Sequence, residues 1–297
     1  MSATTSATHP ILTPPNETVE VTVQRSNPWT TRLARTAIAV CVFTLVIDTS
    51  TVSAMDASRI EDLEVRACVA RTVPDYSMTQ RLDVQMLDDD GAISESSGYL
   101  SWKRFEDGRA KLVVSIVAPP ERAGVAVLLI EREGANPDVF MYIPERRQVR
   151  RVGARTLGAS MLGTDLSYED FTHFQQMVDT GIATRLDDVT LDGHPVYVLE
   201  NIPVDGKSAY SRILTYVDQE KCLPVKTEFF APNGSLHKVL FVERQYVRKV
   251  NDRWVPFRVV MRDYKRDRRT VLATADIRIN PAIRNIVFTP AHLRQGD

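Results

Sequence analysis

A regular series of turn signals constrains most strongly what this chain can fold into. Asp-Gly, Asn-Gly and Asn-Asp pairs occur at residues 90–91, 107–108, 192–193, 233–234 and 251–252. Runs rich in valine, isoleucine, tyrosine and phenylalanine lie between most of these pairs, which is typical of β-hairpins. From Met78 onward apolar and polar residues alternate, as Leu82, Val84 and Met86 illustrate, and this is the period of a β-strand. The series therefore predicts consecutive antiparallel hairpins.

The hairpins are too numerous for a flat sheet, because strongly twisted open sheets rarely exceed about ten strands. We expect about eleven strands and one further hairpin, at residues 78–88, 96–106, 109–118, 124–131, 137–144, 147–152, 182–191, 194–202, 210–218, 222–230 and 236–250, with the hairpin at 253–263 and 269–279.

One amphipathic helix is predicted before the strands, over residues 57–70. Ser58 is its expected N-cap, and the expected apolar face consists of Ile60, Leu63, Ala67 and Cys68. The helix and the irregular segment 153–180 are the available covers for a concave sheet. We predict a mainly β (α+β) fold, in which a highly curved antiparallel sheet forms a half-open β-barrel closed by the N-terminal helix and a lid segment. A plain β-sandwich is the alternative.

The N-terminal segment has the pattern of a secretory signal peptide. Arg25, Arg32 and Arg35 precede the apolar run 36–47, and Val52-Ser-Ala54 follows as a small-residue cleavage site. The apolar run is shorter than the roughly 20 residues that a spanning helix needs. We expect cleavage after Ala54, which divides the chain into an extension with a signal peptide, 1–54, and an exported domain, 55–297. An inner-membrane anchor formed by residues 36–47 is the alternative.

The cysteines agree with export. Cys41 lies inside the apolar run, and its removal leaves Cys68 and Cys222, an even number in a compartment that permits disulfides. A bridge between the N-terminal helix and the sheet is one interpretation. The other interpretation is that both cysteines are unpaired and buried as small apolar residues.

Several predicted strands are apolar on both faces, notably 112–118, 125–130 and 196–199. A half-solvated strand alternates apolar and polar residues. Strands of this kind therefore have a core on one side and a cover on the other. The cover could be a segment of the protein or a lipid.

A basic stretch at residues 145–151 follows these strands. On one strand Arg147 and Arg151 would share a face, and guanidinium groups bind oxyanions in a bidentate fork. The stretch could clamp an anionic headgroup at the mouth of a cavity. It could equally be an edge strand whose charge discourages pairing, partly neutralised by acids downstream, namely Asp165, Glu169 and Asp170.

Segment 161–171 contains those acids and a glycine. Asp165 could cap a short helical turn. The segment could also act as a lid over the concave face.

The sequence contains little that points to catalysis, metals or nucleic acid. Its 37 basic and 38 acidic residues leave a net charge of −1, so no global field attracts nucleic acid. We interpret the scattered histidines as structural or surface residues, at His173, His194, His237 and His292. No nucleophile elbow, phosphate loop or C-x-x-C motif occurs. We expect neither an enzyme nor a cofactor.

Two segments resemble a known family. Tyr142-Ile-Pro144, with the arginines and valines of 147–152, is similar to the Y-L-P-x-x-x-R-V-R-R-I stretch of the outer-membrane lipoprotein-sorting protein family. Residues 161–171 are similar to its F-M-G-S-D-F-T-Y-E-D-L stretch. That family is related to the periplasmic carrier LolA and its receptor LolB. The resemblance spans roughly Ser77 to Arg294 and implies a LolA-like domain within 55–297.

The resemblance also implies a function. We expect a periplasmic carrier or sorting factor that binds acyl chains of a lipid or lipoprotein for delivery toward the outer membrane. Its implied partners are an inner-membrane RND-type transporter or an outer-membrane receptor. The alternative is a non-carrying interaction module, such as an accessory subunit of such a transporter. The candidate cavity and rim residues are Val127, Leu129, Met141, Tyr142, Arg147, Arg151, Met161 and Tyr168.

Overall fold

The computed structural model describes residues 63–72, 77–132, 136–176, 183–203 and 208–294. The predicted signal peptide, its cleavage site after Ala54 and the alternative anchor at 36–47 lie outside the described residues. The helices and strands are α1 (Leu63–Thr72), β1 (Ser77–Asp88), β2 (Gly91–Arg104), β3 (Ala110–Ala118), β4 (Ala126–Ile130), β5 (Asp138–Ile143), β6 (Gln148–Val152), α2 (Tyr168–Gln176), β7 (Ala183–Leu191), β8 (His194–Asn201), β9 (Arg212–Asp218), β10 (Leu223–Phe230), β11 (Leu236–Val242), β12 (Val247–Val250), β13 (Arg253–Pro256), β14 (Arg258–Asp263) and β15 (Arg268–Ile279).

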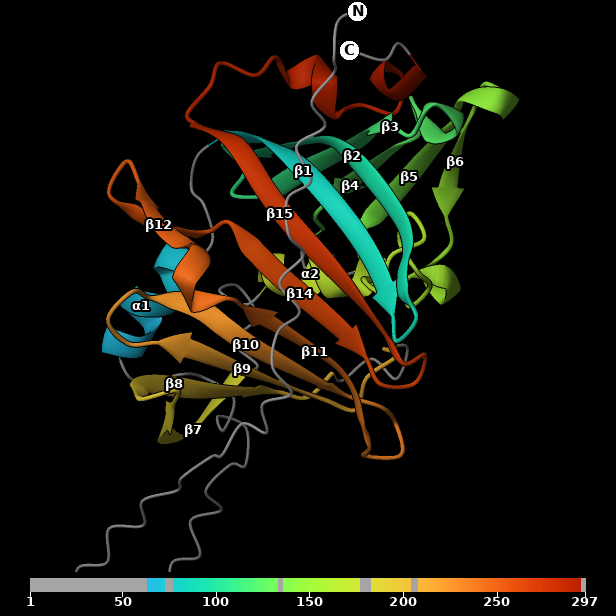
Figure 1. The fold of residues 1–297 in the computed structure, drawn as a ribbon. Coiled ribbons are helices and arrows are strands. Elements are labelled where there is room, and N and C mark those ends of the chain that lie inside the picture. Colours follow the sequence, from blue (N-terminus) through green and yellow to red (C-terminus); the bar gives the residue numbers. More distant parts are fainter. Residues whose placement is uncertain (1–62, 73–76, 133–135, 177–182, 204–207, 295–297) are drawn as a thin grey trace, which may run out of the picture.

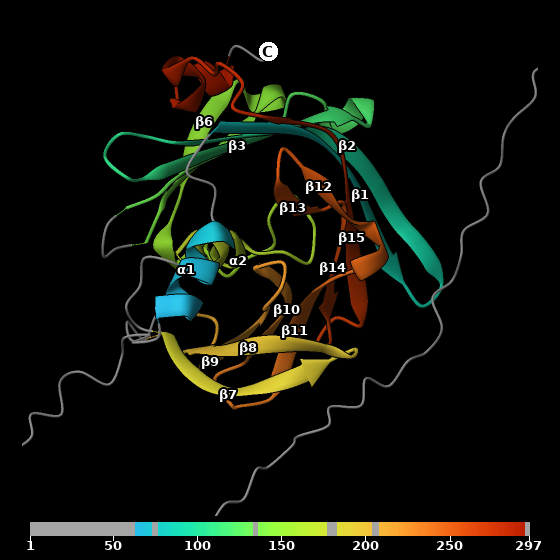
Figure 2. The same ribbon diagram turned by 90° about the vertical axis from the view of Figure 1, so that its left-hand side faces the viewer.

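One curved antiparallel sheet dominates the fold (Figure 1). Its 13 strands follow the order β6-β5-β4-β3-β2-β1-β15-β14-β11-β10-β9-β8-β7. Figure 2 shows that the sheet wraps around α1 and α2, which lie inside its curve. We call this concave side the inner face and the opposite side the outer face. The predicted half-open barrel, covered by an N-terminal helix and the segment after β6, is confirmed.

The first and last strands join the two halves of the sheet. Val84 of β1 pairs with Leu272 of β15, so the sheet is continuous across the middle of the barrel. β6 and β7 are consecutive in sequence but lie at opposite edges of the sheet, and the described part of the connection between them lies on the inner face (Figure 2). This connection contains α2.

The C-terminal hairpins differ from the prediction. The strand expected at 236–250 is broken by a 3-10 turn at Arg244–Tyr246, and the strand expected at 253–263 is broken at Phe257. The intervening β12 and β13 form a separate two-stranded hairpin. β11 then pairs with β14 and stays in the main sheet.

The apolar face of α1 also differs from the prediction. Leu63 and Ala67 are exposed, whereas Val65 and Cys68 are buried. Val65 and Cys68 pack against Tyr197 and Leu199 of β8, together with Val217 of β9. Val65 and Cys68 are three positions apart and therefore lie on the same face of the helix. This narrow face is the part of α1 that contacts the sheet.

The strands that are apolar on both faces are covered by protein on the outside. An outer cluster joins Ala126 and Leu128 of β4 to Val287, Phe288 and Leu293 of the C-terminal segment. Figure 1 shows this segment lying against the outside of β3 to β6. A segment of the chain, and not a lipid, therefore accounts for the outward apolar residues of β4.

Candidate functional site

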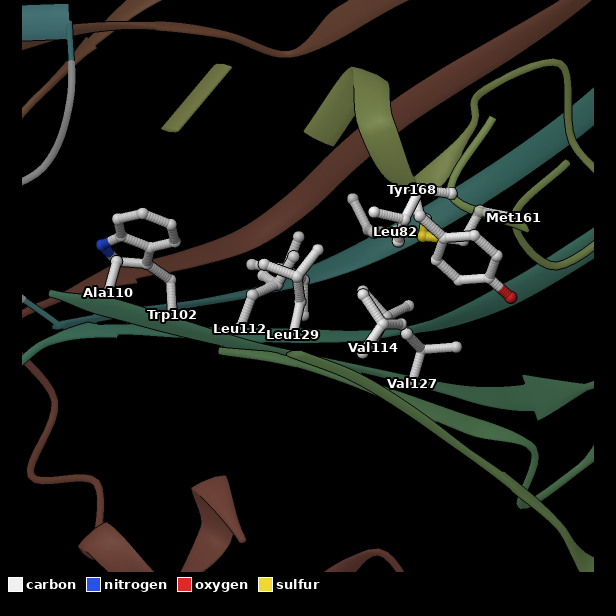
Figure 3. Packing of buried hydrophobic residues seen from close by; sticks show 12 residues of the cluster. Leu82, Trp102, Ala110, Leu112, Val114, Val127, Leu129, Met161 and Tyr168 are labelled. Carbon is white, nitrogen blue, oxygen red and sulfur yellow. The ribbon is translucent and has the colours of Figure 1, made fainter. Parts of the chain in front are cut away.

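A strap, residues 157–171, crosses the inner face between β6 and β7 and ends in the first turn of α2. Its apolar side chains enter two separate clusters on the sheet. The first inner cluster contains Leu82, Leu100, Trp102, Ala110, Leu112, Val114, Val127, Leu129, Val139, Leu157, Met161 and Tyr168. The second inner cluster contains Leu166, Tyr210, Ile213, Phe229, Leu240 and Met261. Figure 3 shows Met161 and Tyr168 facing Val114 and Val127 of the sheet.

A row of half-buried apolar residues lies between the two clusters. Val84, Leu272 and Val259 are cross-strand neighbours on β1, β15 and β14. All three are only partly buried, and Val84 contacts the first cluster while Leu272 and Val259 contact the second. The inner face is thus least tightly covered along its central strands.

Asp165 ties the strap to β15. Its carboxylate accepts hydrogen bonds from Arg268, with 2.8 Å between Nη2 and Oδ1, and from the Thr270 hydroxyl at 2.8 Å. The Asp165 N–H also donates to the Thr270 hydroxyl. Asp165 is fully buried, so these contacts replace the water that the charge loses.

Asp170 ties the strap to β11 and to Tyr210, two residues before β9. It accepts hydrogen bonds from the Tyr210 hydroxyl at 2.6 Å and from Nζ of Lys238 at 3.1 Å. It also accepts the Ser167 N–H, while its own N–H donates to Ser167 Oγ. This reciprocal pair is a capping box. Ser167, and not Asp165, is therefore the N-cap of α2.

Glu169 supplies a third polar anchor. It accepts hydrogen bonds from the Ser208 hydroxyl and from the Ala209 N–H. The three acids of the strap thus bind β15, β11 and segment 208–210. The alternative in which they neutralise the arginines of 146–151 is wrong. These anchors fix the position of the strap on the sheet.

His173 of α2 makes folding sensitive to pH. Burial lowers the pKa of His173 to about 4, although the Asp170 carboxylate acts in the opposite direction. A histidine in an unfolded chain titrates near about 6.5. Between these values the unfolded chain binds the proton more readily, so the free energy of unfolding should decrease as the pH falls from about 6.5 to about 4. Urea unfolding should show a smaller decrease for His173→Phe, and an unchanged pH dependence in that variant would contradict this assignment.

The structure brings most of the predicted cavity residues together as core. Val127, Leu129, Met161 and Tyr168 are buried in the first inner cluster, and Met141 packs against its edge. Tyr142 instead packs against the outer cluster. Sequence reasoning missed the partly buried residues of the inner face, such as Val84 and Leu272. The alternation of apolar and polar residues along 78–88 and 269–279 was the signal that could have identified them.

The two predicted rim arginines lie at the edge of the sheet. Arg147 precedes β6 in a left-handed conformation with φ 46°, so it does not share a strand face with Arg151. Arg151 pairs with Asp138 on the outer face, and Arg132 binds the same carboxylate. Burial acts to raise the pKa of Asp138, but hydrogen bonds from Arg132 and Arg151 outweigh it and lower that pKa.

The disulfide between Cys68 and Cys222 is confirmed. It joins α1 to the residue before β10, with a Cα–Cα distance of 5.0 Å. The bridge fastens the helix over one end of the inner face.

A cavity of about 550 Å³ lies outside the strap, and no strap residue lines it. Most of its lining belongs to the outer face of β1, β2 and β15, including Asp83, Gln85 and Ala273, with Arg258 from β14. Val84 of the half-buried row also belongs to its lining. Charged and polar side chains alternate with apolar ones along its lining. On the inner face, side chains of the strap pack against side chains of the sheet in both clusters.

Other kinds of site are not found within the described residues. They contain no group of three or more histidine, cysteine or acidic side chains placed to hold a metal ion. In the same part of the chain, no helix combines the length and apolar character required to cross a membrane.

Comparisons with known proteins place this geometry in a fold family. A family model described only as "Uncharacterized protein" matches residues 108–295. A search of curated proteins found no match.

Three solved structures share the fold. An outer membrane lipoprotein-sorting protein domain from Vibrio parahaemolyticus superposes with a TM-score of 0.72 at 22% identity, covering 78% of this chain and 97% of that one. A DUF1329 family protein from Desulfovibrio piger gives 0.71 at 20% identity, covering 77% and 96%. A LolA superfamily protein from Nitrosomonas europaea gives 0.60 at 21% identity, covering 77% and 98%. The resemblance noted in the sequence is confirmed at the level of the fold.

Proposed function

Because the chain belongs to the family described as "Uncharacterized protein" and has a LolA-like fold, we propose that it is a periplasmic carrier. In this proposal it holds an acyl chain of a lipid or lipoprotein against the inner face of its sheet and delivers it toward the outer membrane. The proposed route to the periplasm is the signal peptide within residues 1–54.

The observation that carries the proposal is the divided inner face. Two apolar clusters are separated by the half-buried row Val84, Leu272 and Val259, so an acyl chain could extend an existing apolar surface. Each methylene group buried there would contribute about 0.8 kcal/mol.

The inner face contains several methionines, whose side chains can adapt to a ligand. Met78 and Met141 pack at the edge of the first inner cluster, Met161 lies within it, and Met261 lies in the second. Unbranched, polarizable methionine side chains repack at little cost around ligands of different shape. Since strap side chains pack on both inner clusters, loading in this proposal requires the strap to shift.

A substitution tests this reading directly. Val84→Trp should place an indole over the half-buried Leu272 and weaken binding of a fluorescent fatty acid by about tenfold or more, because the acyl chain and the indole would compete for the same surface. The matched control is Val117→Trp, since Val117 is 48% exposed at the end of β3 and should tolerate the indole without affecting binding. Fluorescence titration and circular dichroism measure affinity and fold.

The packed inner face favours a second candidate. If the clusters never open, the protein is a non-carrying periplasmic module, such as an accessory subunit of an inner-membrane RND-type transporter. Wild-type protein that binds no fatty acid, and that contains no lipid after purification from an exporting host, would establish this alternative over the carrier.

A further inference from the structure

β6 ends the sheet on one side. It pairs with β5 on one flank, and the described residues place no strand on the other. Figure 1 shows β6 at the margin of the sheet. Along its free flank, alternate N–H and C=O groups point away from the sheet, and Gln148, Arg150 and Arg151 are exposed. Such an edge is a template for one further strand.

Cations concentrate at this edge although the whole chain is nearly neutral. Five arginines lie on β6 or in the turns that flank it, at positions 146, 147, 150, 151 and 155. Among the described residues, Arg146, Arg147 and Arg155 form no ion pair, and Arg150 bonds only to Gln148. Only Arg151 is neutralised, by Asp138. The edge therefore carries cationic groups that the fold does not use.

The arginines flank the edge from both sides. Arg150 pairs with Met141, whose side chain packs on the first inner cluster, so Arg150 lies on the inner side. Arg151 pairs with Phe140, which packs on the outer cluster, so Arg151 lies on the outer side. A flat lipid surface could meet only one of these sides. A strand added in the plane of the sheet would be reached from both.

We propose that the free edge of β6 binds an extended acidic segment of a partner protein, which joins the sheet as an additional strand. Main-chain hydrogen bonds would supply alignment, and the arginines that the fold leaves unpaired, Arg150 on the inner side among them, would bind carboxylates on one face of the segment. The same charges repel a second β6 edge, which restricts pairing to acidic strands. This inference is independent of the carrier function.

The test uses a short fluorescein-labelled peptide of alternating glutamate and valine, titrated into the purified exported protein. The peptide should bind, and amide hydrogen exchange at Gln148–Val152 should slow. Arg146→Gln combined with Arg150→Gln should weaken binding by about tenfold and lower its sensitivity to salt. A matched pair, Lys265→Gln with Arg278→Gln, removes two exposed cations elsewhere and should leave binding unchanged.

Two further probes separate strand addition from charge attraction alone. The same peptide with alternate N-methylated amides keeps its charges but loses the edge donors, and it should not bind. Equal binding of the N-methylated peptide, or no binding of the unmodified one, would overturn the proposal. Binding to phosphatidylglycerol vesicles in place of the peptide would assign the edge to a membrane. Self-association that the arginine variant abolishes would assign it to a second copy.

Discussion

Replacing Asp170 with alanine should lower the free energy of unfolding by about 3–5 kcal/mol, because a buried charge would lose its partner. Lys238 is 5% exposed and Asp170 is fully buried. The Tyr210 hydroxyl and the Ser167 N–H would lose their acceptor as well. Burial, followed by the Asp170 charge, raises the pKa of Tyr210, so this hydroxyl remains a donor. Urea unfolding, followed by circular dichroism, measures the loss.

A double replacement is the control for this prediction. Asp170→Leu combined with Lys238→Met removes both charges and should destabilise the protein less than Asp170→Ala alone. A loss below about 1 kcal/mol for Asp170→Ala would show that the strap is not held by this contact.

Replacing Cys68 with serine should lower the free energy of unfolding by about 2–5 kcal/mol. The bridge joins residues separated by 154 positions, so its loss frees a long loop in the unfolded chain. Cys222→Ser and reduction of the wild-type protein should have the same effect. In material from an oxidising compartment, alkylation and mass spectrometry should find Cys68 and Cys222 unreactive. Two reactive thiols at these positions would contradict the bridge.

The local signals in the sequence were strong enough to predict the hairpins of the sheet. Each Asp-Gly or Asn-Gly pair lies at a turn between strands, as at Asp90 and Asn233, because these residues tolerate the conformations that tight hairpins need. The cysteine pair was equally informative. The pairing of β1 with β15 has no local signal, since it joins residues nearly 190 positions apart, Val84 and Leu272.

The errors have physical causes. Residues 236–250 alternate well enough for one long strand, yet tertiary contacts turn the chain at Arg244, which binds Asp218 of β9. The sequence did not show which segment covers the apolar outer face of β4. The covering residues Val287 and Phe288 belong to a short 3-10 helix, which has no periodic sequence pattern.

The candidate site was predicted less well than the fold. Segment 153–180 was correctly expected to cover the concave face, but the partners of its acids were not predicted, and one alternative paired them with the arginines of 145–151. The acids alternate with Leu166, Tyr168 and Phe171 in the sequence, and this pattern could have indicated that they are buried. Because a buried charge needs a partner, the pattern would also have indicated that each acid is paired. Those partners, Lys238 and Arg268, lie far away in sequence.

Residue-level mapping of a photoreactive fatty acid tests the central claim most directly. A diazirine on the acyl chain, activated after incubation with the exported protein, should label Val84, Val259 and Leu272 on the inner face, and unlabelled fatty acid should compete. Mass spectrometry of the digested protein locates the modified residues. Labelling confined to the outer cavity, at Asp83, Gln85 or Ala273, or no competable labelling at all, would contradict the carrier account.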